Sequence, residues 1–255
     1  MMVQRLVLLL LVMLIVCLGC GKPMQKLKKI TWTKDGAEMA FVPGRSMKAL
    51  DTYDQFGDTI PGGILQERDA FYMDTTEVTV GQFKKFLKSS GYEPKDPIDW
   101  AELYGYSLTG DHPMIYVSWF DATAYAEWAA KRLPTEKEWE FAVRGGLVGK
   151  EFPWGDEESI AREYANFEGA LGRDQWGKTT APVGSFKPNG YGLYDIAGNV
   201  WEWCQDWYDD LEEYQVLRGG SWIYYADLLH VAARNSYLPS HRDNDSGFRC
   251  VSGAN

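Results

Sequence analysis

The sequence predicts an α+β domain with two main helices, small antiparallel sheets and much irregular loop. Three observations support this class. Two stretches repeat apolar residues at helical spacing, short strand-like runs precede them, and the chain beyond Gly145 is rich in Gly, Pro, Asn and Trp. A hydrophobic content of 45%, with many aromatic residues, requires a packed core. No internal repeat divides the chain, so residues 30–255 are expected to form one domain.

Three strands are expected in the first third of the chain. Residues 30–32 and 39–44 look like early strands that end in a turn at Pro43-Gly44. Residues 68–74 place Phe71 and Met73 at alternate positions, as a half-buried strand does. Together they predict a small sheet ahead of the first helix.

The two main helices follow. Residues 80–90 should form the first, because three apolar side chains share one helical face and Gly91 is a stop signal. Those three side chains are Phe83, Phe86 and Leu87. Residues 118–131 predict the second helix, and its apolar register consists of Ala122, Tyr125, Ala126 and Ala129.

A third, shorter helix is predicted after Pro134. Thr135 and Glu138 have the spacing of a capping box, in which each side chain accepts a backbone N–H of the other residue. This helix should run through Val143. Beyond Gly145 we expect short strands and long, well-packed loops, which need side-chain networks or bound ions to hold them.

The N-terminus has the pattern of an export signal. Arg5 precedes an apolar run over residues 6–16, which is short for a membrane span and typical of a signal peptide. Gly19-Cys20 resembles a bacterial lipobox, although Cys17 stands where Leu is usual. We expect residues 1–19 to be a lipoprotein signal peptide, Cys20 to be acylated, and residues 20–29 to form a tether. Ordinary secretion with cleavage nearby is the alternative.

Lipid on Cys20 would hold the domain at a membrane without a transmembrane helix. The expected location is therefore the bacterial cell envelope, at its outer surface, with the protein acting as a monomer. A net charge of −10 argues against nucleic acid as a partner. After processing and acylation of Cys20, only Cys204 and Cys250 are left with a thiol, and the sequence leaves open whether they pair.

The segment from Ile223 to Gly247 differs from the rest of the chain in composition. It contains no Lys, Glu, Gln, Met or Trp, although these types make up 59 of the 255 residues. With this composition, the chance that a given stretch of 25 residues contains none of the five types is on the order of one in a thousand. None of the five types has a codon that ends in a pyrimidine, so randomised Asn codons would lack all of them. The alternative is a polar surface loop in which the gap is chance.

Several sequence blocks together resemble the formylglycine-generating enzyme, or sulfatase-modifying factor, family. They cover nearly all of residues 38–251 in the expected order. The blocks are Glu77–Phe83, Val117–Ala122, Arg132–Glu140, Phe152–Gly155, Asn189–Asp195, Gly198–Trp203, Arg218–Trp222 and Gly247–Arg249. The resemblance implies an α+β, C-type-lectin-like fold.

Most of these blocks have ordinary structural interpretations. The glycine pairs at 145–146 and 219–220 suit backbone turns, Glu138 should cap a helix, and Glu140 should join a hydrogen-bond network. Five tryptophans are expected to be core aromatics. They are Trp119, Trp139, Trp154, Trp201 and Trp203.

The resemblance breaks at the catalytic residues. Enzymes of this family oxidise a substrate cysteine with copper held by two thiolates that follow the Gly-Gly-Ser-aromatic block. Here Tyr224 stands at the first position, Leu228 and Leu229 stand near the second, and no Cys lies between Ser221 and Ser246. The family partner of Cys250 maps to Val143, so that disulfide should be missing as well. We therefore expect no copper site and no enzyme of the known kind.

The chain also resembles variable proteins of diversity-generating retroelements, which reuse the same fold. Those proteins end in an Arg-Gly-Gly-Ser-Trp … Gly-Phe-Arg segment with randomised adenine-bearing codons, and some are surface lipoproteins. This resemblance implies a surface-displayed ligand-binding lipoprotein with a variable region at about residues 222–248. The alternative is a formylglycine-generating-enzyme-like oxidoreductase or a catalytically silent relative.

The varied side chains should lie on one exposed face and bind a protein or glycan ligand. Tyr side chains give large contacts at low entropic cost, and Asp, Asn, Ser and His add adaptable hydrogen bonds. The predicted binding residues are Ile223, Tyr224, Tyr225, Asp227, Leu229, His230, Asn235, Ser236, Tyr237, His241, Asp243, Asn244 and Asp245.

Two structural calcium sites are implied by the enzyme resemblance. Mixed carboxylate, amide and carbonyl oxygens suit Ca²⁺. One site would use the side chains of Asn166 and Asp174 and the carbonyls of Phe167 and Trp176. The other would use the side chains of Asp195 and Glu202 and the carbonyls of Gly198 and Val200. The alternative is that these Asp and Asn residues only cap turns.

Overall fold

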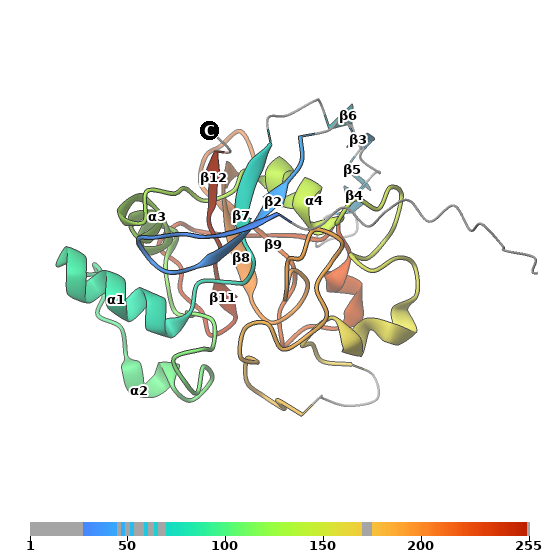
Figure 1. Cartoon of the computed structure of the whole chain (residues 1–255). Coiled ribbons are helices and arrows are strands. Elements are labelled where there is room, and N and C mark those ends of the chain that lie inside the picture. Colours follow the sequence, from blue (N-terminus) through green and yellow to red (C-terminus); the bar gives the residue numbers. More distant parts are fainter. Residues whose placement is uncertain are drawn as a thin grey trace, which may run out of the picture.

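The computed structural model describes residues 28–44, 47–48, 52–53, 59–60, 64–65, 70–169 and 175–253. The predicted signal peptide, the lipidation site Cys20 and most of the tether lie outside these residues. The fold is the α+β, C-type-lectin-like one, with few helices, small sheets and long loops (Figure 1). Within the described ranges, none of the helices has both the length and the apolar character needed to cross a membrane.

The first sheet joins the two ends of the domain. Its strands lie in the order β1–β2–β7–β12, and all its pairings are antiparallel. The bounds are β1 Lys29–Thr31, β2 Glu38–Val42, β7 Phe71–Asp74 and β12 Val251–Gly253. The three strands expected from the sequence are therefore confirmed, and the last strand pairs with β7.

The second sheet carries the C-terminal segment. Its order is β10–β9–β8–β11, and β11 runs parallel to β8 while the other pairs are antiparallel. The bounds are β8 Trp201–Trp207, β9 Gln215–Arg218, β10 Arg234–Tyr237 and β11 Ser246–Gly247. Two further two-stranded pairs join β3 Met47–Lys48 to β6 Ile64–Leu65 and β4 Thr52–Tyr53 to β5 Thr59–Ile60.

The helices begin at the residues that can cap them. Helix α1 spans Val80–Ser90 behind a capping box of Thr79 and Gln82, and it ends at Gly91, which has a φ of 71°. Helix α4 spans Glu136–Val143 and has the predicted Thr135–Glu138 capping box. Two 3₁₀ turns occur in the loops, η1 Glu158–Glu163 and η2 Ala226–Leu229.

Two details of the helices differ from the expectation. Helix α3 spans Trp119–Trp128 and ends before Lys131, whose Nζ lies 2.8 Å from Asp35 and 2.7 Å from Asp74. This buried ion pair, after Ala130 at a φ of 56°, requires the chain to leave the helix early. A short helix α2, Trp100–Leu103, was missed because its only local signal is the cap Asp99.

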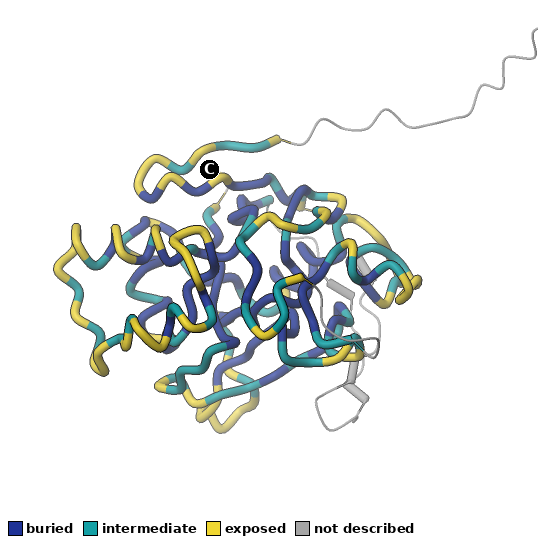
Figure 2. The backbone as a smooth tube through the Cα atoms, turned by 90° about the horizontal axis from the view of Figure 1, so that it is seen from below, coloured by how far each residue is buried: buried dark blue, intermediate teal, exposed yellow. Residues whose placement is uncertain are grey.

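The hydrophobic core lies between α1, α3 and the second sheet, with a second cluster between α4 and the first sheet. Figure 2 shows buried backbone through the centre of the molecule and exposed residues on the outer loops. Trp139, Trp201 and Trp203 are fully buried, as predicted. Trp119 and Trp154 are only half-buried. The Trp119 indole N–H donates inward to the carbonyl of the buried Cys204 at 2.9 Å.

Strand β8 offers a matched test of the core. Trp203 is 0% exposed and donates to the Val117 carbonyl at 3.0 Å, whereas Trp207 on the same strand is 39% exposed. We expect Trp203→Ala to lower the free energy of unfolding by roughly 3–5 kcal/mol, because it leaves a large cavity. Trp207→Ala should cost about 1 kcal/mol or less. Urea unfolding curves measure both, and equal losses would contradict this placement of the core.

Candidate functional site

The predicted binding segment leaves β9 through a turn that only glycine fits. Gly219 and Gly220 have φ values of 105° and 78°. A Cβ on Gly220 would lie 2.6 Å from the Leu228 carbonyl oxygen, so the turn and η2 touch backbone to backbone. The predicted role of this glycine pair in a turn is confirmed.

An aromatic cluster forms the centre of the segment. We define it as Tyr224, Tyr237 and His241, which are all partly exposed. The rings of Tyr237 and His241 lie 4.1 Å apart between centroids. Tyr224 packs edge-on against Trp201 at 5.9 Å, and Tyr237 packs against Trp203 at 6.4 Å. The predicted residues of the cluster are therefore brought together, on top of buried framework tryptophans.

Polar groups surround the aromatic cluster. The His241 Nε2 atom lies 3.5 Å from the Asp243 carboxylate. Burial raises the pKa of Tyr224 and of Tyr237, whose hydroxyls are hydrogen-bonded to each other, so both phenols stay protonated. Tyr225 is 58% exposed and Asp227 is also exposed. The cluster can thus offer apolar ring surface together with neutral and charged hydrogen-bonding groups.

Three of the predicted binding residues are buried, and their assignment to an exposed face is wrong. Leu229 packs with Phe152 and Phe167 in a separate apolar cluster. Asn235 faces inward on β10 and is 6% exposed. Asp245 is 1% exposed and accepts from the Ser221 hydroxyl at 2.8 Å. A strand or turn sends part of its side chains inward, and composition does not say which ones.

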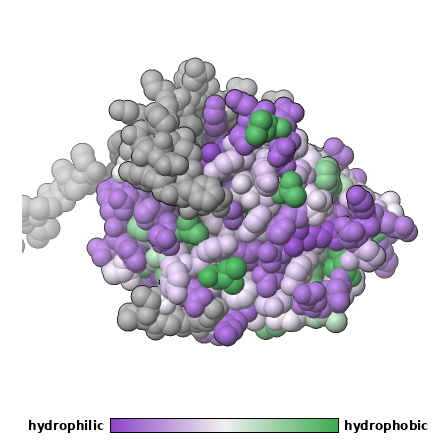
Figure 3. All heavy atoms as spheres, turned by 180° about the vertical axis from the view of Figure 1, so that it is seen from behind, coloured by the Kyte–Doolittle hydropathy of each residue, from purple (hydrophilic) through white to green (hydrophobic). Residues whose placement is uncertain are grey.

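The other predicted residues are at least partly exposed, but they do not all adjoin the aromatic cluster. His230 packs edge-on against Phe152, with ring centroids 4.5 Å apart. The remaining partly exposed members are Ile223, Ser236 and Asn244. Figure 3 shows one face of the molecule, where hydrophobic residues form small scattered patches in a mostly hydrophilic surface.

The framework holds this segment by its backbone carbonyls. Arg218 is fully buried, and its guanidinium donates to the carbonyls of Val231 and Ala232 at 2.7 and 3.0 Å. The Trp222 indole donates to the Asn244 carbonyl at 3.2 Å, and the Tyr116 backbone N–H donates to the Asp243 carbonyl at 2.9 Å. Every L-amino acid presents the same carbonyl group. These bonds therefore do not depend on which side chain stands at each position.

The two described cysteines are unsuited to thiolate chemistry. Cys204 and Cys250 are both free and fully buried. Burial raises the pKa of each thiol well above its usual range. A thiol in this state is a poor nucleophile and a poor metal ligand. No group of three or more His, Cys, Asp or Glu side chains within the described ranges is arranged to hold a metal ion.

The first predicted calcium site contains groups that already have protein partners. The Asn166 amide donates to the Thr179 carbonyl at 3.1 Å. The Phe167 carbonyl accepts from Arg162 at 2.5 Å, and the Trp176 carbonyl accepts from the Thr179 hydroxyl at 2.8 Å. Asp174 lies outside the described residues. The Asn166 N–H groups and these two carbonyls thus hold the loop itself, while these bonds do not use the Asn166 amide oxygen.

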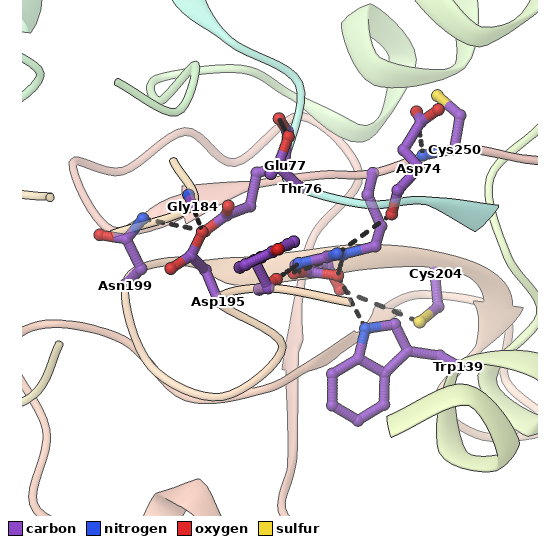
Figure 4. Close-up of polar contacts among 12 residues, drawn as sticks. Asp74, Thr76, Glu77, Trp139, Gly184, Asp195, Asn199, Cys204 and Cys250 are labelled. Atoms are coloured by element: carbon purple, nitrogen blue, oxygen red, sulfur yellow. Dashed lines mark hydrogen bonds and ion pairs between the residues drawn. The ribbon is translucent and has the colours of Figure 1, made fainter. Parts of the chain in front are cut away.

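The second predicted calcium site is divided by an ion pair. Glu202 accepts from Arg249 at 2.7–2.9 Å and from the Trp139 indole at 2.7 Å, so both its oxygens are engaged. Asp195 accepts from the Gly184 N–H at 2.5 Å with one oxygen (Figure 4). The carboxylate beside Asp195 is that of Glu77, which the sequence analysis did not assign. Burial raises the pKa of Asp195 to about 6 and that of Glu77 well above its usual range.

Comparisons with known proteins agree with this fold. The family described as "Sulfatase-modifying factor enzyme 1-like domain" matches residues 29–254. The formylglycine-generating enzyme of Streptomyces coelicolor is 42% identical over 173 residues, which cover 58% of this chain and 55% of the enzyme. The chain spans 55–66% of the length of the first curated enzymes that it matches.

Two solved structures are similar over almost the whole domain. PvdO from Pseudomonas aeruginosa superposes with a TM-score of 0.73 at 26% identity, covering 89% of this chain and 98% of that one. Treponema denticola variable protein 1 superposes with a TM-score of 0.68 at 23% identity, covering 90% of this chain and 99% of that one. The similarity to the Treponema denticola protein shows a shared fold.

Asp245 gives a test of burial within the binding segment. Burial raises its pKa from 3.8 to about 6, so the native protein binds this proton more tightly than the unfolded chain does. The free energy of unfolding therefore falls as pH rises from about 4 to about 6, where Asp245 must ionise in the native protein. This loss of stability remains at pH 7. We expect Asp245→Asn to raise the free energy of unfolding at pH 7 by roughly 2–3 kcal/mol and to change little at pH 4. Chemical unfolding at both pH values measures this, and an equal effect at both would disprove it.

Proposed function

We propose that this chain, which belongs to the family of sulfatase-modifying factor enzyme 1-like domains, is a ligand-binding protein rather than an oxidase. Residues 222–248 form its variable region, and a retroelement diversifies that region to alter ligand specificity. The ligand is a protein or glycan. An open aromatic surface surrounded by hydrogen-bonding groups suits a macromolecule, whereas a small ligand would need a pocket.

The observation that carries the proposal is the way the framework holds the segment. Arg218, Trp222 and Tyr116 bond to backbone carbonyls of residues 231–244. A region whose side chains vary needs contacts through its backbone, and these bonds supply them, although Arg234, Arg242 and Asp245 also bond to the framework through their side chains. The restricted set of amino-acid types between Ile223 and Gly247 is independent support.

Binding would centre on the aromatic cluster. Tyr224 and Tyr237 rest on the rigid indoles of Trp201 and Trp203, so their rings are pre-organised and lose little entropy on binding. His241, Asp243 and the exposed Tyr225 supply the adaptable contacts around them. Leu229, Asn235 and Asp245 are buried, so only side chains that fit the interior can replace them.

The alternative function is that of a formylglycine-generating-enzyme-like oxidoreductase or a catalytically silent relative, which the family membership favours. Two observations argue against oxidase chemistry. The thiols of Cys204 and Cys250 are buried and protonated, and no Cys lies between Ser221 and Ser246. The two functions are distinguished by incubating the purified protein with copper, oxygen and a Cys-containing sulfatase peptide. An aldehyde mass shift in that peptide would favour the enzyme.

Diversification predicts a pattern of variation in the gene. In a population of cells that carry it, codon differences should be confined to residues 222–248 and should match adenines of a near-copy beside a reverse transcriptase gene. Among functional variants, the codons of Leu229 and Asn235 should vary least, because these side chains are buried. Deep sequencing of the locus measures this. Differences spread evenly over residues 30–255 would refute the proposal.

Anchoring is proposed separately, on the export pattern at the N-terminus. Lipid on Cys20 would place the binding domain on the bacterial envelope, at the end of a short tether. We expect Cys20→Ser to abolish incorporation of labelled fatty acid and to move the protein from the membrane fraction to the soluble fraction. Unchanged membrane association of the Cys20→Ser protein would show that the anchor is not there.

A further inference from the structure

An exposed aromatic surface lies beside the aromatic cluster but outside residues 222–248. We define this fixed patch as Trp119, Phe120 and Trp207. Phe120 is 54% exposed and Trp207 is 39% exposed, whereas Trp119 is half-buried. Large apolar side chains that gather on the surface of a folded domain are typical of a site that binds another molecule.

Two contacts of Trp119 bring the fixed patch together. Its ring packs edge-on against that of Phe120, with centroids 5.6 Å apart. Its indole N–H donates to the carbonyl of Cys204, which lies on β8 three residues before Trp207. The patch therefore joins the first turn of α3 to the end of β8.

The fixed patch is continuous with the variable segment. The Trp119 backbone N–H donates to the Pro239 carbonyl at 3.0 Å. In the second sheet Tyr237 pairs with Gln215, and Gln215 pairs with Trp207. Side chains of directly paired residues share one face of a sheet, so Tyr237 and Trp207 lie in one row. A macromolecule seated on the aromatic cluster would therefore contact the fixed patch as well.

Negative charge stands next to the fixed patch. Strand β8 continues from Trp207 into a hairpin tip, residues 208–214, which we call the acidic hairpin. The Tyr208 N–H donates to the Tyr214 carbonyl at 2.8 Å and closes this tip. Four exposed carboxylates lie on it, those of Asp209, Asp210, Glu212 and Glu213. The backbone thus holds these charges close to Trp207.

The cation nearest to the acidic hairpin does not offset these charges. The Arg234 guanidinium lies 4.3 Å from the centroid of the Tyr208 ring, but it is paired with Glu136 at 2.6 Å. Among the residues that the structure describes, none of the four tip carboxylates forms an ion pair. The acidic hairpin therefore attracts positively charged groups, most strongly at low salt.

We propose that the fixed patch and the acidic hairpin together bind a basic segment of a protein ligand, in which Lys or Arg side chains stand next to apolar ones. This inference rests on the proposed function and narrows its ligand to a protein. The apolar side chains would cover Phe120 and Trp207, and the cations would lie along the four carboxylates. A neutral glycan would gain nothing from the negative charge.

The fixed patch would give every variant of the protein the same contact. Its residues lie outside residues 222–248, so they stay the same while the variable side chains select among ligands. Exposed Trp and Phe rings supply large contact areas, and the hairpin charges mainly speed the encounter with a basic partner.

The test uses the purified full chain and a dye-labelled synthetic peptide in which Lys and Leu alternate, with binding measured by fluorescence anisotropy. We expect binding that weakens as NaCl rises and that disappears when Glu replaces Lys in the peptide. Phe120→Ala and Trp207→Ala should each weaken binding roughly fivefold or more, because each removes an aromatic contact. Asp210→Asn combined with Glu213→Gln should reduce both the affinity and its dependence on salt.

Val148→Ala is the matched control, because Val148 is 61% exposed on the loop after α4 and lies outside the fixed patch. Tyr225→Ala changes an exposed side chain of the variable segment. Both variants should keep the wild-type affinity for the Lys-Leu peptide. Circular dichroism checks that every variant folds.

The inference would be overturned if the peptide did not bind, or if it bound equally well to Phe120→Ala and Trp207→Ala. Binding of maltohexaose in place of the peptide would overturn it too, in favour of a glycan. Loss of peptide binding in Tyr225→Ala alone would place the contact in the variable segment, against the fixed patch but in keeping with the proposed function. Failure of the proposed function itself is detected independently, by sequencing of the locus.

Discussion

The buried ion pair of Arg249 and Glu202 is the constraint on which the rest of the structure depends. Both side chains are excluded from water, and the guanidinium also donates to the carbonyls of Asp74 and Tyr194. These partners come from β8, from β7 and from the loop before β8, so one side chain joins both sheets to the irregular half. Removal of either partner would strand a buried charge, at a cost of about 3–5 kcal/mol. This pair also engages both carboxylate oxygens of Glu202.

Local rules were enough for the elements that are capped and periodic. Helices α1 and α4 begin and end where Thr79, Gly91 and Thr135 place them, because those signals act within one turn. The end of α3 could not be predicted, since it is set by the contacts of Lys131 with Asp35 and Asp74, which are distant in sequence. The parallel pairing of β11 with β8 likewise follows from the path of the whole chain.

The candidate site was predictable in its location but not in its division into surface and interior. Composition identified residues 223–247, yet it could not tell that Asp245 turns inward to Ser221 while Asp243 stays at the surface. Glu77 was missed because it lies in a block that was noted only for its family resemblance. An acidic residue two positions before a helix-capping Thr, directly before the buried Val78, was the one local sign of it.

A binding protein with a changeable surface needs one set of residues to hold the fold and another set to contact the ligand. Buried side chains such as Arg218 and Trp222 hold the segment by carbonyl groups that every residue has. Only side chains that contribute nothing to this framework are then free to change. The aromatic cluster meets that condition in part, because Tyr224 and Tyr237 cover Trp201 and Trp203. Replacing them by small residues would expose indole surface, so variation at these two positions should favour residues that still cover the rings.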